Sequence, residues 1–266
     1  MKHVLLVRML VHLGRKPAPF RVVDTHAGIG RYDLAGPEAA RTEEWQTGIG
    51  RLEAPFAADV EDLLGPYRAV VGSVRDRHGP STYPGSPGIL RELLRRDDRA
   101  ILIEKHPEDG LLLAERFNAV RNIKVLTGDG WAALGGLIPP PERRGLVLID
   151  PPYEEPDELA RSVPRLAAAW RKWPTGTFAL WYPVKLATEI DGFARALAAE
   201  LDAPMLRLEL LVDWPDDPRR LNGSGLVVIH PPWTLAAEAA ILLPALAERL
   251  GRGAGAGSKI EAIGPA

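Results

Sequence analysis

The chain has 266 residues, a formal net charge of −2 and a hydrophobic content of 46%. This length suits one α/β domain with an insertion, or two small domains, and the apolar content suffices for a sizeable core. The absence of cysteine excludes a disulfide framework and thiolate chemistry, and no apolar run reaches the length of a membrane span. We therefore expect a cytoplasmic protein without membrane contacts, in which any nucleic-acid binding depends on local basic patches.

The first predicted element is a helix over residues 4–13. No Ser, Thr, Asp or Asn precedes this helix as an N-cap, so we expect its first turn to fray. A buried strand over residues 20–24 leads into the turn Thr25-His26-Ala27-Gly28-Ile29-Gly30. A glycine-bearing turn after a first strand lets a nucleoside-type ligand approach the backbone closely. Asp33 replaces the third glycine of the dinucleotide fingerprint, which disfavours a nicotinamide-dependent dehydrogenase.

Residues 34–82 interrupt the alternation of strands and helices, and their apolar residues recur at helical spacing. We interpret this segment as a small helical insertion, so that the core comprises residues 1–33 and 83–266. The first half of the insertion is acidic, whereas the second half is basic and ends in Arg77 and His78. A run of charges of this kind usually marks a solvated face, and contact with RNA is the alternative interpretation.

Acidic residues recur where predicted buried strands end. They are Glu104 at the end of residues 100–104, Asp129 after residues 123–126 and Asp150 after residues 146–149. Nucleoside-binding folds hold the ribose hydroxyls with an acid at the end of the second strand, which is the position of Glu104. Asp129 is placed to accept a hydrogen bond from an adenine amino group. Each acid alone is compatible with a helix cap, and it is their recurrence that indicates a site.

The stretch Asp150-Pro151-Pro152-Tyr153 ends the third of these strands, because proline donates no hydrogen bond to a sheet. This is the form of a motif in S-adenosylmethionine-dependent enzymes that methylate exocyclic amino groups, above all N6 of adenine. The Asp150 carboxylate and the Pro151 carbonyl would accept the two N–H groups and aim the nitrogen lone pair at the methyl donor. Tyr153 would stack on the extruded base. The plain alternative is a strand that ends in an Asp-Pro turn.

Helices and strands continue to alternate toward the end of the chain. The predicted helices cover residues 158–173 and 186–201, and the predicted strands cover residues 177–182, 206–212 and 225–229. His230-Pro231-Pro232-Trp233 echoes the earlier motif, but a histidine does not replace an ionised carboxylate, so we interpret it as a structural turn at the wall of the site. The Gly/Ala-rich tail after Gly251 is expected to be loosely held. Together these elements predict an α/β fold with a seven-stranded, mostly parallel sheet.

Motifs spread along nearly the whole chain resemble those of the bacterial 23S rRNA adenine-N6 methyltransferases of the RlmJ family. They are Lys2-His3, Asp24-Thr25-His26-Ala27-Gly28-x-Gly30-Arg31-Tyr32, Tyr83-Pro84-Gly85-Ser86-Pro87, Glu104-x-His106-Pro107, Asp129-Gly130, Asp150-Pro151-Pro152-Tyr153-Glu154, Leu180-Trp181-Tyr182-Pro183, Ser224-Gly225 and Pro231-Pro232-Trp233. The resemblance implies a Rossmann-like core, S-adenosylmethionine as methyl donor, S-adenosylhomocysteine as product, and no metal. It further implies that a monomer methylates N6 of adenine 2030 in 23S rRNA, as naked or early-assembly RNA.

The resemblance also assigns individual positions. It implies cofactor contacts at His3, His26, Ser86, Glu104, Asp129, Gly130 and Asp150, and catalysis by Asp150, Pro151 and Tyr153. Without the resemblance, the two histidines are ordinary polar residues and the serine is a helix cap. Family members carry a further N-terminal segment over the active site, so we expect weak cofactor binding and slow turnover from a chain that starts at the Lys-His pair.

Two alternative functions stay open at this point. The first is a DNA adenine-N6 methyltransferase, which uses the same Asp-Pro-Pro-Tyr motif. Such an enzyme normally needs a sizeable domain for duplex recognition, and the predicted insertion is small. The second is a non-catalytic RNA-binding relative with the same fold, and the intact motif argues against it.

Overall fold

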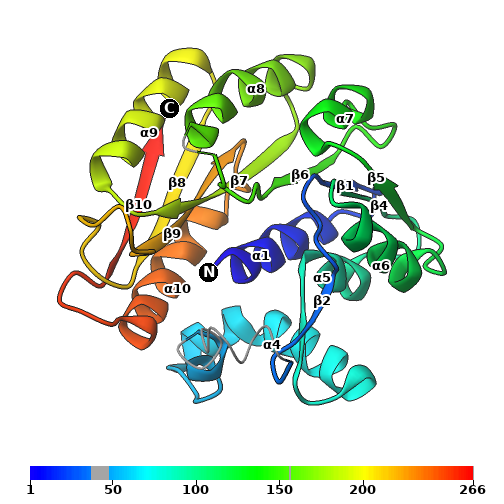
Figure 1. Cartoon of the computed structure of the whole chain (residues 1–266), viewed down its shortest axis with the longest axis horizontal. Coiled ribbons are helices and arrows are strands. Elements are labelled where there is room, and N and C mark those ends of the chain that lie inside the picture. Colours follow the sequence, from blue (N-terminus) through cyan, green and yellow to red (C-terminus); the bar gives the residue numbers. More distant parts are fainter. Residues whose placement is uncertain (37–47, 156, 266) are drawn as a thin grey trace.

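The computed structural model describes residues 1–36, 48–155 and 157–265. Its main feature is a sheet of eight strands in the order β10-β8-β9-β7-β6-β1-β4-β5, covered by helices on both faces (Figure 1). The strands are β1 (Arg21–Asp24), β4 (Arg99–Glu104), β5 (Ile123–Thr127), β6 (Gly145–Ile149), β7 (Thr177–Val184), β8 (Met205–Leu211), β9 (Gly223–Ile229) and β10 (Gly257–Ile263). The pairs from β5 to β7 are parallel, whereas β9 pairs antiparallel with β7 and β8, and β10 pairs antiparallel with β8.

The predicted α/β class with a mostly parallel sheet is confirmed, but the predicted number of seven strands is wrong. The eighth strand, β10, lies in the tail that we expected to be loosely held. It pairs with β8 along its full length, from Gly257 opposite Leu211 to Ile263 opposite Met205. Ile260 and Ile263 anchor β10 because their side chains pack against the cores on the two faces of the sheet.

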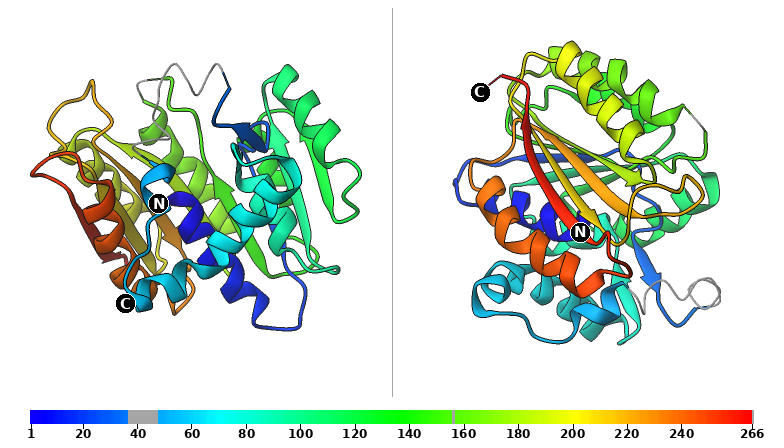
Figure 2. Two further views of the ribbon diagram at one scale, coloured as in Figure 1. Left: turned by 90° about the horizontal axis from the view of Figure 1, so that it is seen from below. Right: turned by 90° about the vertical axis from the view of Figure 1, so that its left-hand side faces the viewer.

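Helices lie on both faces of the sheet (Figure 2), and a hydrophobic core lies between the sheet and the helices on each face. The side chains of β1 alternate between them, with Val22 in one core and Val23 in the other. The first face is covered by α1 (Lys2–Gly14), α5 (Ser86–Leu93), α6 (Pro107–Phe117) and α10 (Leu235–Leu250), and α4 (Ala58–His78) packs on the outer side of this layer. The second face is covered by α7 (Gly130–Leu137), α8 (Glu158–Lys172) and α9 (Ala187–Glu200).

Helix α1 is held firmly at the centre of the first face. The buried guanidinium of Arg8 donates two hydrogen bonds, of 2.8 and 2.9 Å, to the carboxylate of Glu238 on α10. The first turn, which we expected to fray, is anchored by a hydrogen bond of 2.8 Å between His3 Nδ1 and the Tyr83 hydroxyl. No side chain caps the helix, but this bond fixes the start of α1 beside the carboxyl edge of the sheet.

The chain between β1 and β4 forms a smaller unit against α1. Strands β2 (Arg31–Asp33) and β3 (Thr82–Pro84) make a separate antiparallel pair, and η1 (Ile49–Leu52) precedes the long helix α4. Residues 37–47 of the predicted insertion lie outside the described residues. Helix α4 packs on α1, α5 and α10 of the core, so the insertion is not separated from the core by a clear boundary. The division into core and insertion therefore stays a proposal. Within the described ranges, no helix is both long and apolar enough to cross a membrane.

Candidate active site

A cleft of about 900 Å³ opens at the carboxyl edge of the parallel strands. Ligands of open α/β sheets bind at this edge, and the volume is within the range of ligand pockets. Every residue to which the resemblance assigned a cofactor contact lines this one cleft: His3, His26, Ser86, Glu104, Asp129, Gly130 and Asp150. The loops after β1, β4, β5 and β6 therefore bring together side chains that are far apart in the sequence.

Two glycines let neighbouring segments of the protein pack closely against the backbone at this cleft. Gly28 has a φ of 58°, a left-handed conformation that favours glycine, and a side chain there would collide with the Tyr32 hydroxyl. At Gly130 a side chain would collide with the carbonyl of Thr25. The glycine turn after β1 and the start of α7 are therefore packed so tightly that larger residues do not fit without a shift.

Glu104 links the second strand of the core to the glycine turn. Its two carboxylate oxygens accept hydrogen bonds of 2.8 Å from the backbone N–H groups of Gly28 and His106. An ionised carboxylate offers about four acceptor positions, so about two remain for other donors. The predicted contact with ribose hydroxyls is compatible with this geometry.

We expect Glu104→Ala to weaken binding of S-adenosylhomocysteine by about 1.5–3 kcal/mol, the range for a hydrogen bond to a charged group. This corresponds to a dissociation constant roughly 10- to 150-fold higher, which isothermal titration would measure directly. Glu108→Ala is the matched control, because Glu108 is exposed on α6 and does not line the cleft. Equal dissociation constants for the two variants would contradict the assignment of Glu104.

Asp129 is a helix cap as well as a residue of the cleft. Its Oδ1 accepts a hydrogen bond of 3.0 Å from the Ala132 N–H at the start of α7, and Lys105 Nζ lies 3.4 Å from Oδ2. The hydrogen bond from Ala132, together with Lys105, lowers the pKa of this carboxyl. Asp129 is therefore ionised at neutral pH, and its predicted bond to an adenine amino group would fall to the less constrained Oδ2.

His26 lies beside Trp131 in the same cleft. Its Nδ1 is 2.8 Å from the Thr25 hydroxyl, and its ring meets that of Trp131 edge-on at a centroid distance of 6.4 Å. Burial lowers the pKa of His26, so the ring is neutral at pH 7. Ser86 is the first residue of α5 rather than its N-cap, which is Gly85, so the capping alternative for Ser86 is not what the structure shows.

Lys2 is a residue of this site that sequence reasoning missed. Its ammonium group makes an ion pair with Asp150 Oδ2 and lies 5.6 Å from the centre of the Trp181 ring. The motif Lys2-His3 was visible in the sequence, but the two paired residues are 148 positions apart. No local pattern indicates that the first residue of α1 reaches the end of β6.

Tyr153 adopts a backbone conformation that is uncommon for a bulky residue, with a φ of 55°. Its hydroxyl donates a hydrogen bond of 2.5 Å to the Trp181 carbonyl, and the two rings meet at 62° with centroids 5.8 Å apart. Burial, reinforced by the charge of Asp150, raises the pKa of Tyr153. Pro152 lines the cleft whereas Pro151 and Tyr153 stand beside it, so their predicted roles at the base stay predictions.

Comparison with known proteins identifies the family. The family model described as "Ribosomal RNA large subunit methyltransferase D, RlmJ" matches residues 17–262. The chain belongs to the RlmJ family. The proteins named "Ribosomal RNA large subunit methyltransferase J" from Haemophilus influenzae and Escherichia coli are each 38% identical to it over 253 residues, which is 94% of this chain and 89% of theirs. A crystal structure of a Legionella pneumophila protein is 30% identical and has a TM-score of 0.86, covering 98% of this chain and 95% of that one.

Membership of the RlmJ family confirms three predictions made from the sequence. These are the family itself, the Rossmann-like α/β fold and an S-adenosylmethionine-dependent methyltransferase. The individual roles of the cleft residues are a separate matter. Their common location in one cleft is a structural observation, and the contacts that each would make stay predictions.

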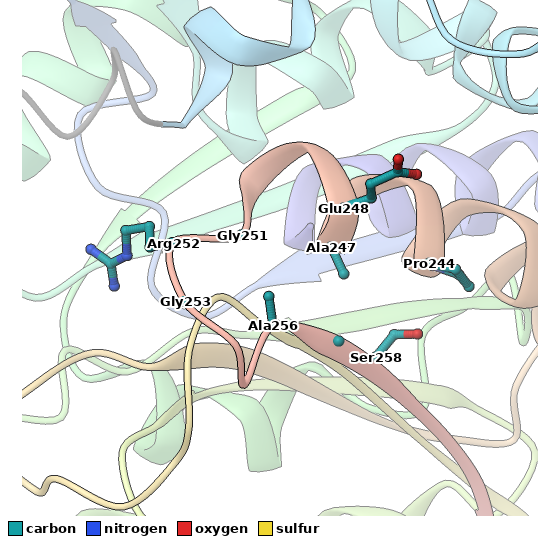
Figure 3. A pocket seen from close by; sticks show the side chains of 9 residues that line it. Pro244, Ala247, Glu248, Gly251, Arg252, Gly253, Ala256 and Ser258 are labelled. Atoms are coloured by element: carbon teal, nitrogen blue, oxygen red, sulfur yellow. The ribbon is translucent and has the colours of Figure 1, made fainter.

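A second hollow, of about 540 Å³, lies between the end of α10 and β10 (Figure 3). Its lining consists largely of small residues, among them Ala247, Gly251 and Ala256. The charged side chains of Glu248 and Arg252 point in different directions rather than toward a common point (Figure 3). We assign the RlmJ-family chemistry to the cleft at the carboxyl edge and not to this hollow.

Proposed function

We propose that this chain transfers a methyl group from S-adenosylmethionine to N6 of an adenine in 23S rRNA, namely adenine 2030. The observation that carries the proposal is the position of Asp150-Pro151-Pro152-Tyr153, where β6 ends at the cleft that also contains Glu104 and Asp129. Support for an RNA substrate comes from the two relatives, which are named as methyltransferases of large-subunit ribosomal RNA.

The cleft suits the proposed methyl donor in shape and charge. S-adenosylmethionine carries a positively charged sulfonium and supplies the methyl group. Acids dominate the lining of the cleft: Glu104, Asp109, Asp129, Asp150, Glu154, Glu155 and Glu158. In our proposal Glu104 holds the ribose hydroxyls, and Asp129 accepts from the adenine amino group of the donor.

Asp150 and Pro151 would prepare the target nitrogen. The amino nitrogen of adenine is a poor nucleophile, because its lone pair is delocalised into the ring. Acceptors on both N–H groups favour a tetrahedral nitrogen and release the lone pair, which is catalysis by positioning and electrostatics. Lys2 occupies Oδ2 of Asp150 and orients the carboxylate, so that Oδ1 is left to accept an N–H of the base.

The experiment that tests this function is a methylation assay with product analysis. The protein is incubated with labelled S-adenosylmethionine and, separately, with unmodified 23S rRNA, 16S rRNA, tRNA and duplex DNA. We expect N6-methyladenosine in 23S rRNA, at adenine 2030. Methylated deoxyadenosine in the DNA arm would favour a DNA methyltransferase instead. Cofactor binding with no methylation in any arm would favour a non-catalytic relative.

A second arm defines the form of the substrate and of the enzyme. We propose that a monomer acts on naked or early-assembly RNA, because an extruded adenine must reach the end of β6 inside the cleft. Naked 23S rRNA and assembled large subunits are compared at equal concentration, and the mass of the active protein is measured in solution. Faster methylation of assembled subunits, or activity found only in a dimer, would contradict this part of the proposal.

A further inference from the structure

A cluster of basic side chains lies directly behind the glycine turn of the active site. Arg31 of β2, Arg77 and His78 at the end of α4, Arg91 of α5 and Arg116 of α6 line a narrow cleft, which we call the basic cleft. Glu92 is the one acid among the described residues that line it. Four guanidinium groups from four elements therefore converge, in a chain whose net charge is −2.

The positive charges of the basic cleft are only partly offset by the carboxylate of Glu92 that lines it. Glu92 is already engaged, because it makes an ion pair with Arg77 and accepts a hydrogen bond of 2.8 Å from the Ser73 hydroxyl. Arg31 donates to the ring of His78 at 2.8 Å instead of to a carboxylate. Burial and the neighbouring Arg31 lower the pKa of His78, so this ring is a neutral acceptor at pH 7.

Like charges also act on one another here. The pKa of Arg31 is lowered first by burial and then by the repulsion of Arg116 and Arg91. Within residues 1–36, 48–155 and 157–265, no carboxylate lies within ion-pair distance of Arg91. A bound anion would relieve this repulsion and accept hydrogen bonds from Arg91, whereas Nη1 of Arg116 already donates to the carbonyls of Ile29 and Arg31 at 2.7 and 2.8 Å.

The basic cleft and the active-site cleft share a wall. Strand β2 runs between them, and successive side chains of a strand point to opposite sides. Arg31 accordingly lines the basic cleft, whereas Tyr32 lines the active-site cleft and is 41% exposed. The glycine turn is shared in the same way, with Gly28 on the active-site side and Gly30 on the basic side.

We propose that the basic cleft binds the phosphate backbone of the RNA next to the adenine that enters the active site. This inference rests on the proposed function, since it takes the substrate to be RNA. A phosphodiester provides the anionic oxygens that arginines bind best, and backbone contacts of this kind position a nucleic acid without reading its sequence. The position behind the glycine turn explains how RNA could be held without blocking the cofactor side of the cleft.

The test uses charge reversal on the full chain. Arg91→Glu should weaken binding of a labelled RNA hairpin with an unpaired loop adenine about tenfold at roughly 0.1 M salt, and should lower the salt dependence of the affinity by about one phosphate contact. The rate of methyl transfer at saturating RNA and the affinity for S-adenosylhomocysteine should equal those of wild type. Arg195→Glu is the matched control, because Arg195 is exposed on α9, on the opposite face of the sheet.

Two further comparisons make the outcome decisive. Thermal unfolding would reveal whether the charge reversal in Arg91→Glu disturbs folding. Arg91→Gln is milder and should show the same loss of salt dependence without such a disturbance. If Arg91→Glu and Arg91→Gln bind RNA as Arg195→Glu does, the basic cleft is only a solvated face. Binding that depends on Arg91 without methylation of any RNA would leave this site standing and remove the proposed function instead. Methylation of RNA by a protein whose affinity for RNA does not depend on Arg91 would do the reverse.

Discussion

Asp150→Ala should still bind S-adenosylhomocysteine, yet transfer methyl groups about 10²–10³ times more slowly at saturating cofactor. The reason is that a well-placed acceptor, which acts on the charge developing in the transition state, is typically worth that factor in rate. Asp150 stands where β6 ends and Lys2 holds one of its oxygens, so the carboxylate is oriented before the substrate arrives. The measurement is a single-turnover rate at saturating cofactor and RNA.

Two companion variants sharpen this prediction. Asp150→Asn keeps the size of the side chain but replaces one acceptor oxygen by a donor, so it should be about as slow as Asp150→Ala. Asp157→Ala removes an exposed acid shortly after the motif, at the start of α8, and should keep the wild-type rate. A rate for Asp150→Asn close to wild type would show that shape rather than the carboxylate matters, and would contradict the proposed chemistry.

The strands that position the site were predictable, because each is a short apolar run that ends at a residue unfavourable to a buried strand, such as an acid or a proline. Leu146 to Ile149 are all buried, and Asp150 with two prolines marks the end of this strand unambiguously. Glu104 was predictable for the same reason. Local composition is informative here because a parallel strand buried on both faces needs apolar residues at every position.

Strand direction was not predictable from such local patterns. His230-Pro231-Pro232-Trp233 repeats the form of Asp150-Pro151-Pro152-Tyr153, and we expected it at the wall of the site. Strand β9 is antiparallel to β7, with Ile229 opposite Phe178, so His230 lies at the edge of the sheet that is opposite to Asp150. Strand β10 was missed because a Gly/Ala-rich turn precedes it and because its pairing with β8 is a tertiary contact.

The contacts made by side chains in the cleft depend still more on tertiary structure. The ion pair of Lys2 with Asp150 joins two residues that are 148 positions apart in the sequence. The hydrogen bond of Tyr153 to the Trp181 carbonyl depends on a left-handed backbone conformation that propensity alone disfavours. Sequence reasoning named residues that the fold brings to one cleft, and the fold decides which of them touch.

Asp24→Asn should make the protein more stable than wild type at pH 8, by up to about 4 kcal/mol. Asp24 ends β1 and is completely buried. Burial raises its pKa from 3.8 to about 7; the nearby Ser86 side chain counteracts this effect in part, and the neighbouring charge of Asp150 adds to it. Ionising this carboxyl in the folded state therefore costs more than in the unfolded chain, by about 1.36 kcal/mol per pKa unit.

The sign of the pH dependence follows from proton linkage. Between about pH 4 and pH 7 the folded state keeps the Asp24 proton that the unfolded state releases, so the free energy of unfolding falls as the pH rises through this window. The advantage of Asp24→Asn should therefore be small near pH 4, grow up to about pH 7 and stay constant above it. Urea unfolding of both proteins at several pH values measures the difference, while the other titrating groups cancel.

Asp98→Asn provides a control of opposite sign. Asp98 is equally buried, and burial raises its pKa, but hydrogen bonds from Arg95 and from the backbone N–H groups of Arg95 and Phe20 outweigh burial and lower it. Its carboxylate thus contributes stability above the unfolded pKa, and Asp98→Asn should be less stable than wild type at pH 8. A stability difference between Asp24→Asn and wild type that does not change with pH would show that Asp24 ionises as freely in the folded protein as in the unfolded chain.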